Sequence, residues 1–294
     1  MKKVGFIGVG IMGKSMVRNL MKAGFELHIY ARTKSKVEDV ISEGAQFHES
    51  IKDCVQDCDA VITIVGFPQD VEEVYFDEGN ILDSAKEGAY LIDMTTTSPQ
   101  IAEKIYEEGT KRGFHVMDAP VTGGDTGAKA GTLSILVGGE KEDYEACMPL
   151  FEAMGTNINY QGKAGCGQHC KLANQIMIAG TLSGVCEALT YAKEQGLDPE
   201  VFMKSVATGA AGSKQLDTFG PKILKDDYAP GFFMKHFIKD MKLALIEANR
   251  KGLSLDVLSM VLANYEELEQ EGYGDLGTQA LMKFYDEEHR NTEE

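Results

Sequence analysis

A glycine-rich turn near the start of the chain constrains the fold more than any other feature. Residues 4–7 form an apolar run typical of a buried strand, and residues 12–23 carry apolar side chains at helical spacing. Between these segments lies the motif Gly8-Val9-Gly10-Ile11-Met12-Gly13. This G-x-G-x-x-G spacing, placed after a strand and at the opening of a helix, is typical of a dinucleotide-binding βαβ unit.

Each glycine of the turn has its own physical role. Gly8 permits the tight turn, Gly10 lets the backbone approach a pyrophosphate, and Gly13 lets the helix lie close to the strand. The helix start at Ile11 and Met12 presents free N–H groups and the positive end of the helix dipole to the anion. We therefore predict that these five residues bind a cofactor; the alternative is a tight turn without a ligand.

Short apolar runs recur through the first half of the chain and then stop. They lie at residues 27–30, 45–47, 60–65, 90–94, 115–118 and 133–137. Helical patterns separate these runs, which predicts βαβ units and a mostly parallel sheet. After about residue 162 the apolar spacing becomes helical, over residues 171–194, 199–207, 237–250, 254–270 and 278–287.

This change of pattern predicts two domains. We expect an α/β Rossmann domain over residues 1–163 and an all-α C-terminal domain over residues 164–294. The polar tail at residues 287–294 is expected to be frayed.

The net charge and the spacing of the cysteines exclude some classes of binding partner and of metal site. A formal net charge of −17 argues against a broad surface for nucleic acid or an anionic membrane. No run approaches the ~18–20 apolar residues of a membrane span. The six cysteines include no C-x-x-C pair, and the spacings Cys54/Cys58 and Cys166/Cys170 are completed by no second cluster. We expect reduced thiols in a cytoplasmic protein and no metal.

The end of the second strand indicates which dinucleotide binds. An NAD site usually places Asp or Glu there, to bond the ribose 2′-hydroxyl. Here the chain reads Tyr30-Ala31-Arg32-Thr33-Lys34-Ser35, and the first carboxylate is Glu38. Arg32 can stack on adenine or pair with a 2′-phosphate, and Thr33 can add a donor. The turn predicts NADP rather than NAD; the alternative is a solvated basic turn.

Two later segments carry candidate substrate chemistry. Thr122, Gly123 and Gly124 follow a strand and can present donors to a carboxylate, although such a segment can also be only a turn. Lys171 falls in or near the first turn of the helix predicted at 171–194, where the helix dipole disfavours its charge. That field and burial would lower the pKa of Lys171 and suit it to proton transfer. The alternative is a surface lysine on a frayed helix start.

Four segments together resemble the β-hydroxyacid dehydrogenase family, which includes 3-hydroxyisobutyrate dehydrogenase, tartronate semialdehyde reductase and, more distantly, 6-phosphogluconate dehydrogenase. They are residues 5–13, 118–124, 165–175 and 237–240, in the family's order and across nearly the whole chain. The resemblance implies a Rossmann domain and a helical domain joined by a long helix, with the active site in the cleft. It also implies hydride transfer between NADP(H) and a small 3-hydroxy acid or its semialdehyde.

The resemblance assigns a role to each matching residue. Lys171 matches the catalytic lysine, and Thr122, Gly123 and Gly124 match a Ser-Gly-Gly that anchors substrate. Asn174 or Gln175 fills a further substrate-binding position. The cofactor-lining matches are Val65, Gly66, Thr96, Lys239 and the arginine Arg32 of NADP-preferring members. Three residues depart from the family's pattern. Thr122 stands where most members have serine, and Ala31 stands where many have asparagine. Gln175 stands where many members have a second asparagine.

Three rival functions share this architecture, and one of them, decarboxylating 6-phosphogluconate chemistry, belongs to an enzyme with a larger helical domain than this chain is long enough to form. An imine reductase usually lacks a lysine at the position of Lys171, and a non-catalytic dinucleotide-binding module would have lost it. The presence of Lys171 therefore counts against both. The apolar helical half and the family type predict a homodimer or homotetramer.

Overall fold

The chain divides into two compact units, Met1–Lys171 and the part that begins at Leu172. The structure is a computed structural model and describes residues 1–285. The units separate inside a long helix, α10 (Cys166–Glu194), whereas the sequence analysis placed the boundary just before it, between residues 163 and 164. The tail expected to be frayed, residues 287–294, lies outside the described residues.

The first unit is built on one sheet. Its strands are β1 (Lys3–Ile7), β2 (Glu26–Tyr30), β3 (Gln46–His48), β4 (Ala60–Thr63), β5 (Tyr90–Asp93), β6 (His115–Asp118), β7 (Val121–Thr122), β8 (Leu133–Gly139) and β9 (Gly155–Gly162). The order is β3-β2-β1-β4-β5-β6-β8-β7, with β9 beside β8. The first six strands pair in parallel, while β8 runs antiparallel to β6 and β7. The predicted Rossmann domain with a mostly parallel sheet is confirmed.

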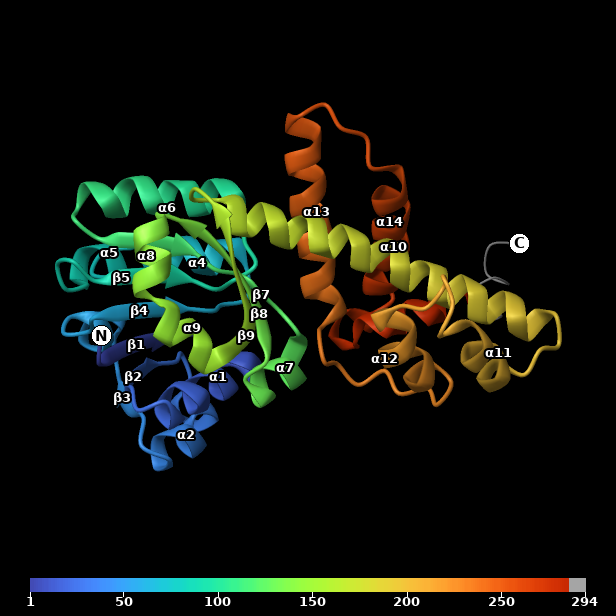
Figure 1. Cartoon of the computed structure of the whole chain (residues 1–294), viewed down its shortest axis with the longest axis horizontal. Coiled ribbons are helices and arrows are strands. Elements are labelled where there is room, and N and C mark those ends of the chain that lie inside the picture. Colours follow the sequence, from blue (N-terminus) through green and yellow to red (C-terminus); the bar gives the residue numbers. More distant parts are fainter. Residues whose placement is uncertain (286–294) are drawn as a thin grey trace. The chain divides into compact units, whose positions relative to one another are not determined.

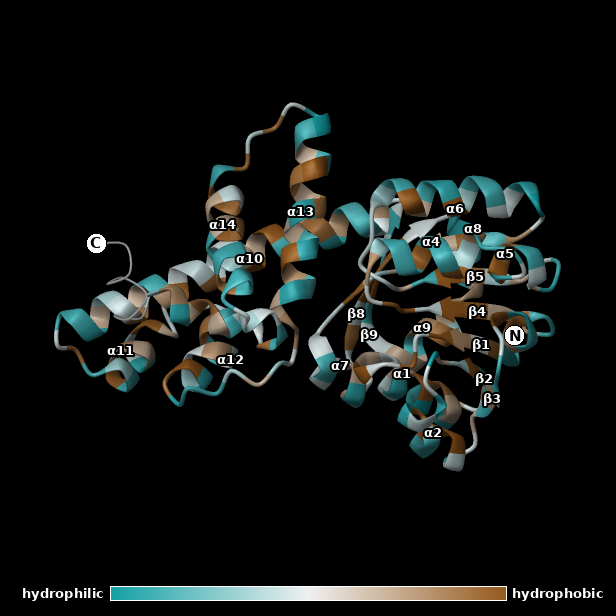
Figure 2. Cartoon of the chain, turned by 180° about the vertical axis from the view of Figure 1, so that it is seen from behind, coloured by the Kyte–Doolittle hydropathy of each residue, from teal (hydrophilic) through white to brown (hydrophobic). Residues whose placement is uncertain are grey.

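Helices cover both faces of this sheet (Figure 1). They are α1 (Ile11–Lys22), α2 (Glu38–Ser42), α3 (Ile51–Val55), α4 (Pro68–Phe76), α5 (Ile81–Ser84), α6 (Pro99–Lys111), α7 (Gly124–Ala130), α8 (Lys141–Ala146) and α9 (Met148–Met154). Side chains alternate along a strand, so Ala60 and Ile62 of β4 join one core with α1, whereas Val61 joins the other core with α3. Both faces of β4 are buried, and the strand is accordingly apolar from Ala60 to Ile62 (Figure 2).

The second unit is helical, as predicted. After α10 come α11 (Pro199–Val206), α12 (Lys214–Ile223), α13 (Met234–Arg250) and α14 (Asp256–Gln270), followed by 3₁₀ turns at Tyr273–Asp275 and Thr278–Tyr285. The helix predicted at 278–287 is thus a 3₁₀ helix as far as Tyr285, and its last two residues lie outside the described residues. Helix α12 was not predicted, because Gly220 and Pro221 interrupt its helical pattern.

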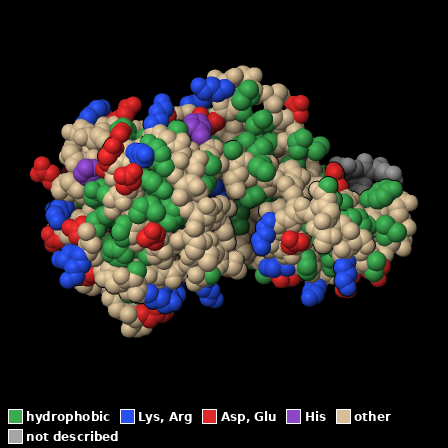
Figure 3. Space-filling model, viewed as in Figure 1, with side chains coloured by type: hydrophobic (Ala, Val, Ile, Leu, Met, Phe, Trp, Pro, Cys, Tyr) green, Lys and Arg blue, Asp and Glu red, His purple; other side chains and the backbone are tan. Residues whose placement is uncertain are grey.

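Helix α10 forms the centre of the second unit. Leu172, Leu182 and Leu189 are buried in its core with side chains of α13 and α14. Within residues 1–285, α10 is also the helix whose length and composition would allow it to cross a membrane. In its most apolar 18-residue stretch 44% is buried inside the structure, and one such helix is weak evidence for a membrane span. On the face drawn in Figure 3, basic and acidic side chains are interleaved over both units.

Candidate functional site

The glycine turn between β1 and α1 combines internal packing with open space. Gly8 has a φ of 97°, and a Cβ there would lie 2.0 Å from the carbonyl oxygen of Ile64. A Cβ at Gly13 would lie 2.2 Å from the carbonyl oxygen of Gly8. At Gly10, by contrast, φ is −84° and a Cβ would meet nothing within 4 Å. The protein's own packing requires Gly8 and Gly13, whereas the open space over Gly10 fits the close approach of a ligand.

The N-terminus of α1 is open in the same way. Gly10 is the N-cap and supplies no side-chain acceptor to the first N–H groups of the helix. Ile11, the first residue of the helix, is 59% exposed. A pyrophosphate fits this environment because unpaired helix N–H groups bind anions.

Five of the other predicted cofactor residues follow the carboxyl ends of neighbouring parallel strands. Arg32 and Thr33 follow β2, Val65 and Gly66 follow β4, and Thr96 follows β5. These ends share one edge of the sheet, and chain order reverses between β1 and β4 at that edge. The structure therefore groups these loops with the glycine turn.

Arg32 has a partner that the sequence analysis did not foresee. Its side chain is 74% exposed, and Nη1 lies 3.2 Å from Oδ1 of Asp70. Asp70 belongs to the first turn of α4, where its Oδ2 accepts a hydrogen bond from the N–H of Phe67 at 2.9 Å. The turn after β2 contains no carboxylate of its own, but the carboxylate of Asp70, 38 residues later in the chain, contacts Arg32. The Asp70 side chain is 18% exposed, but the Arg32 side chain that pairs with it is largely in solvent. The ion pair therefore contributes little stability, and Arg32 can exchange Asp70 for another anion at small cost.

A buried carboxylate lies beneath these loops. Asp93 accepts hydrogen bonds at Oδ1 from the Thr63 hydroxyl at 2.8 Å and from the N–H of Thr95 at 3.1 Å. The Thr95 hydroxyl in turn accepts from the N–H of Val65 at 3.0 Å, which joins the loops after β4 and β5. Burial, which disfavours the charged form, raises the pKa of Asp93 to about 6.

This raised pKa predicts a pH-dependent change in the stability of an Asp93→Asn variant. The unfolded carboxyl ionises near pH 4, so between about pH 4 and pH 6 the native state holds a proton that the unfolded state loses. Stability from Asp93 is thus present at low pH and lost as pH rises through about 6. Relative to wild type, Asp93→Asn should gain about 3 kcal/mol between pH 4 and pH 7. Urea unfolding at several pH values measures this gain, and a difference independent of pH would contradict it.

A second buried carboxylate caps helix α10. Asp118, the last residue of β6, accepts hydrogen bonds from the N–H of Gly165 and from the N–H of Gln168, each at 2.8 Å. Burial raises the pKa of Asp118, and these two N–H donors oppose that shift. A Cβ on Gly167 would lie 2.3 Å from the carbonyl oxygen of Leu136, so glycine is needed for the helix to reach the carboxylate.

Lys171 lies one turn further into the helix than the sequence analysis placed it. Helix α10 begins at Cys166, because Asp118 satisfies its first N–H groups, and Lys171 therefore falls in the second turn. The field of a helix dipole weakens beyond the first turn, so its effect on Lys171 is smaller than we expected. The burial that we expected is present, since Lys171 is only 7% exposed.

The predicted substrate-anchoring residues form a turn between β7 and α7. Thr122 ends β7 and pairs with Ser134 of β8. Gly123 and Gly124 have φ values of 130° and 63°, which L side chains rarely adopt. Gly123 is the N-cap of α7 and supplies no side-chain cap, so this turn also presents a helix N-terminus.

The remaining predicted site residues lie in the second unit and form one hydrogen-bonded chain. The Asn174 amide donates to Oε1 of Gln175 at 2.8 Å, and Nε2 of Gln175 donates to Oδ2 of Asp240 at 2.6 Å. Oδ1 of Asp240 lies 2.9 Å from Nζ of Lys239. Both ends of the buried Gln175 amide are therefore used within the protein, and Lys239 is held by its neighbour.

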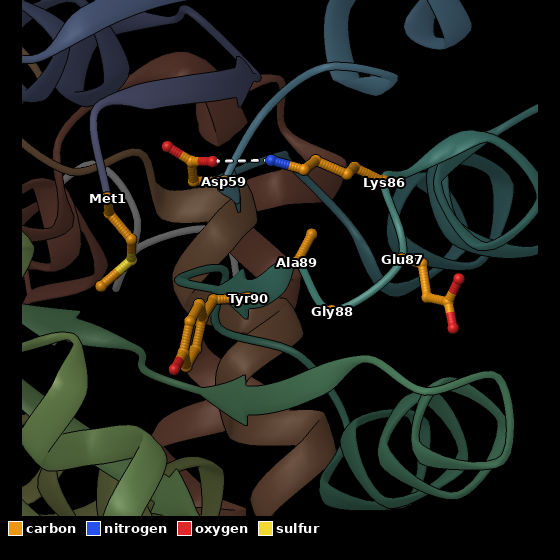
Figure 4. A pocket seen from close by; sticks show the side chains of 7 residues that line it. All are labelled: Met1, Asp59, Lys86, Glu87, Gly88, Ala89 and Tyr90. Atoms are coloured by element: carbon orange, nitrogen blue, oxygen red, sulfur yellow. Dashed lines mark hydrogen bonds and ion pairs between the residues drawn. The ribbon is translucent and has the colours of Figure 1, made fainter.

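A pocket of about 240 Å³ lies elsewhere, at the opposite edge of the sheet. It is lined by Met1, Asp59 and residues 86–90, which precede β1, β4 and β5 (Figure 4). Asp59 faces Lys86 across it, with Oδ1 and Nζ 3.0 Å apart. Ligands of open α/β sheets bind at the carboxyl ends of the strands, so this pocket is not the candidate site. Among residues 1–285 no group of three or more His, Cys, Asp or Glu side chains is placed to hold a metal ion.

Comparison with known proteins covers both units. Residues 3–162 match the family described as the NAD binding domain of 6-phosphogluconate dehydrogenase. Residues 165–285 match the family described as the NAD-binding domain of NADP-dependent 3-hydroxyisobutyrate dehydrogenase. A nicotinamide dinucleotide is therefore the cofactor class.

Individual relatives agree with these families. An uncharacterized oxidoreductase of Bacillus subtilis is 50% identical over 97% of this chain and 99% of its own length. A probable mitochondrial 3-hydroxyisobutyrate dehydrogenase-like protein of Arabidopsis thaliana is 44% identical over 95% of this chain and 84% of its own length. A solved structure of Mycobacterium tuberculosis 3-hydroxyisobutyrate dehydrogenase with L-serine superposes with a TM-score of 0.88 at 26% identity, covering 96% of this chain and 98% of that one. With a Rossmann unit, a helical unit and these relatives, the chain belongs to the β-hydroxyacid dehydrogenase family of oxidoreductases.

Proposed function

We propose that the protein is an NADP-preferring dehydrogenase that transfers a hydride between NADP(H) and a small 3-hydroxy acid or its semialdehyde. The observation that carries the cofactor preference is the exposed Arg32 at the end of β2, in a turn without a carboxylate of its own. A 2′-phosphate carries more charge than the single carboxylate of Asp70 and offers an arginine several acceptors. Thr33, exposed beside Arg32, can add a hydroxyl donor.

The chain's own residues supply binding and proton transfer. When bound, the nicotinamide exchanges the hydride. Thr122 and the N–H groups around Gly123 and Gly124 hold the substrate carboxylate, and Lys171 passes a proton to or from the reacting oxygen. Asn174 lies three residues after Lys171 on the same helix, and we assign it the substrate contact. Gln175 instead orients Asn174 and Asp240, because its amide is engaged at both ends.

Cofactor preference provides the direct test. Purified enzyme is assayed with NADPH and NADH on tartronate semialdehyde, and with NADP⁺ and NAD⁺ on 3-hydroxyisobutyrate and L-serine. We expect a higher kcat/KM with the phosphorylated cofactor. Arg32→Asp should remove charged hydrogen bonds worth about 1.5–3 kcal/mol, or roughly ten- to hundredfold in kcat/KM for NADPH. Lys36→Ala, a matched change of an exposed cation in the same turn, should leave the cofactor ratio nearly unchanged.

The outcomes separate the rival functions. A wild-type enzyme that prefers NADH overturns the NADP assignment while leaving the family intact. Reduction of cyclic imines with no turnover of any hydroxy acid or semialdehyde would favour an imine reductase instead.

We further propose a homodimer or homotetramer. In the second unit, large apolar side chains are more than half exposed; they are Met177 (73%), Tyr191 (67%), Val201 (61%), Val257 (59%), Leu253 (57%) and Met260 (52%). Exposed apolar side chains that form one contiguous patch are typical of an interaction surface, and Val257 of α14 lies beside α10 at Gly180. Light scattering should give at least twice 32.1 kDa, and Met177→Lys with Val257→Lys should lower that mass. A wild-type monomer at every concentration would exclude the assembly.

The oxidation state of the cysteines indicates the cellular compartment. All six are free thiols. We therefore propose a reducing compartment, the cytoplasm.

A further inference from the structure

Gln168 is a buried polar side chain to which neither the sequence nor the proposed reaction assigns a role. It lies in the first turn of α10 and is 0% exposed. Its Nε2 donates to the carbonyl oxygen of Thr95 at 2.7 Å, and its Oε1 accepts from the N–H of Thr97 at 3.0 Å. The amide thus binds the backbone on both sides of Thr96, a residue predicted to line the dinucleotide.

The backbone of Gln168 is fixed as firmly as its side chain. Its N–H donates to Oδ2 of Asp118 at 2.8 Å. The loop that it holds is joined in turn to the loop after β4, through the hydrogen bond from Val65 to the Thr95 hydroxyl. Two cofactor loops and the start of α10 therefore form one hydrogen-bonded body within the first unit.

Lys171 lies at the next turn of the same helix. Residues three apart in an α-helix lie on nearly the same face, about 4.5 Å apart along the axis. A shift or rotation of the first turn is therefore passed on to Lys171. Misplacement of a reacting group by about 1 Å can cost on the order of 100-fold in rate.

We infer that Gln168 is a positioning residue that sets Lys171 in place relative to the loop at Thr96. This inference rests on the proposed role of Lys171 in proton transfer. It goes beyond that role because it names the group that couples the lysine to a cofactor-lining loop. The alternative is that Gln168 merely satisfies buried backbone groups and contributes only to stability.

A matched pair of variants separates these two roles. Gln168→Met keeps the side-chain length and removes both hydrogen bonds. Gln279→Met does the same to another fully buried glutamine, whose Nε2 donates to the carbonyl oxygens of Asp227 and Ala229 at 2.9 and 3.1 Å in the second unit. Both should lower Tm, but only Gln168→Met should lower kcat, by about 10- to 100-fold. Its primary isotope effect with 4-deuterated NADPH should also rise, because hydride and proton transfer become rate-limiting.

A conservative variant and a second readout complete the test. Gln168→Glu keeps the acceptor for Thr97, but its ionised carboxylate faces the carbonyl oxygen of Thr95 with a second acceptor at a fully buried position. It should therefore be impaired like Gln168→Met at neutral pH and recover activity as the pH falls and the protonated carboxyl can donate to Thr95. Hydrogen exchange in Gln168→Met should be faster both in the segment around Thr96 and in the first turn of α10. If Gln168→Met keeps wild-type kcat and isotope effect, or if exchange changes in neither segment, the inference is wrong. If wild type turns over but Lys171→Ala does so equally well, the proposed function of Lys171 has failed instead.

Discussion

Lys171→Ala is expected to keep the fold and lose about 10²- to 10⁴-fold in kcat, the usual contribution of a general acid–base group. Lys171 is nearly buried in the second turn of α10, a position where a charged side chain is uncommon unless it is used. Cofactor affinity should change little, because the glycine turn lies in a different loop. Steady-state kinetics on the best substrate, with NADPH affinity measured by fluorescence, checks both statements.

Two controls test whether the loss of proton transfer causes the expected fall in kcat. Lys171→Arg keeps the charge and should still fail, because a guanidinium does not release a proton at neutral pH. Added methylamine should restore part of the activity of Lys171→Ala, since it supplies the missing amine. If Lys171→Ala kept wild-type kcat, proton transfer would belong to another group and an imine reductase would become the better description.

Gly10→Ala is expected to lose cofactor affinity and keep its stability, whereas Gly8→Ala is expected to lose stability. At Gly10 the φ is ordinary and nothing lies within 4 Å of a Cβ, so Gly10→Ala should keep its Tm. If a pyrophosphate occupies that space, the added methyl group should cost about 1–3 kcal/mol of binding energy, or roughly ten- to hundredfold in NADPH affinity. Calorimetric titration of folded Gly10→Ala with NADPH measures this loss.

Gly8→Ala should instead damage the fold. Its Cβ would meet the carbonyl oxygen of Ile64 at 2.0 Å, and its φ of 97° is strained for alanine. We expect a large fall in Tm, measurable by thermal unfolding without any cofactor. Unchanged NADPH affinity in Gly10→Ala would mean that the open space at Gly10 does not hold the ligand.

Local patterns made much of the fold predictable. Strand β6 was predicted at the residues it occupies, His115–Asp118, because a short apolar run between helical patterns is a local signal. Strand β9 was missed because Thr156, Asn157 and Asn159 give it a polar, exposed edge without the alternation of a half-buried strand. The glycine turn was predictable for the same reason as β6, since its spacing and its flanking elements lie within a few residues.

The parts of the site that depend on long-range contacts were not predictable. Asp118 caps a helix that begins 48 residues later along the chain, and no local pattern announces that hydrogen bond. Asp70 reaches Arg32 in the same way, across 38 residues. The sequence offered Asn174 and Gln175 as equal candidates for the substrate contact, and our proposal of Asn174 depends on the hydrogen bond between Gln175 and Asp240. Tertiary partners of buried polar groups have to be read from the structure.

The sharing of helix α10 between the two units determines where the chain can be cut. A fragment that stops at residue 163 lacks Gly165 and Gln168, the partners of the Asp118 carboxylate. It also exposes the backbone of Thr95 and Thr97 that Gln168 covers. A Rossmann fragment intended for expression by itself must therefore extend at least through Lys171, past the end of the sheet and into the helix.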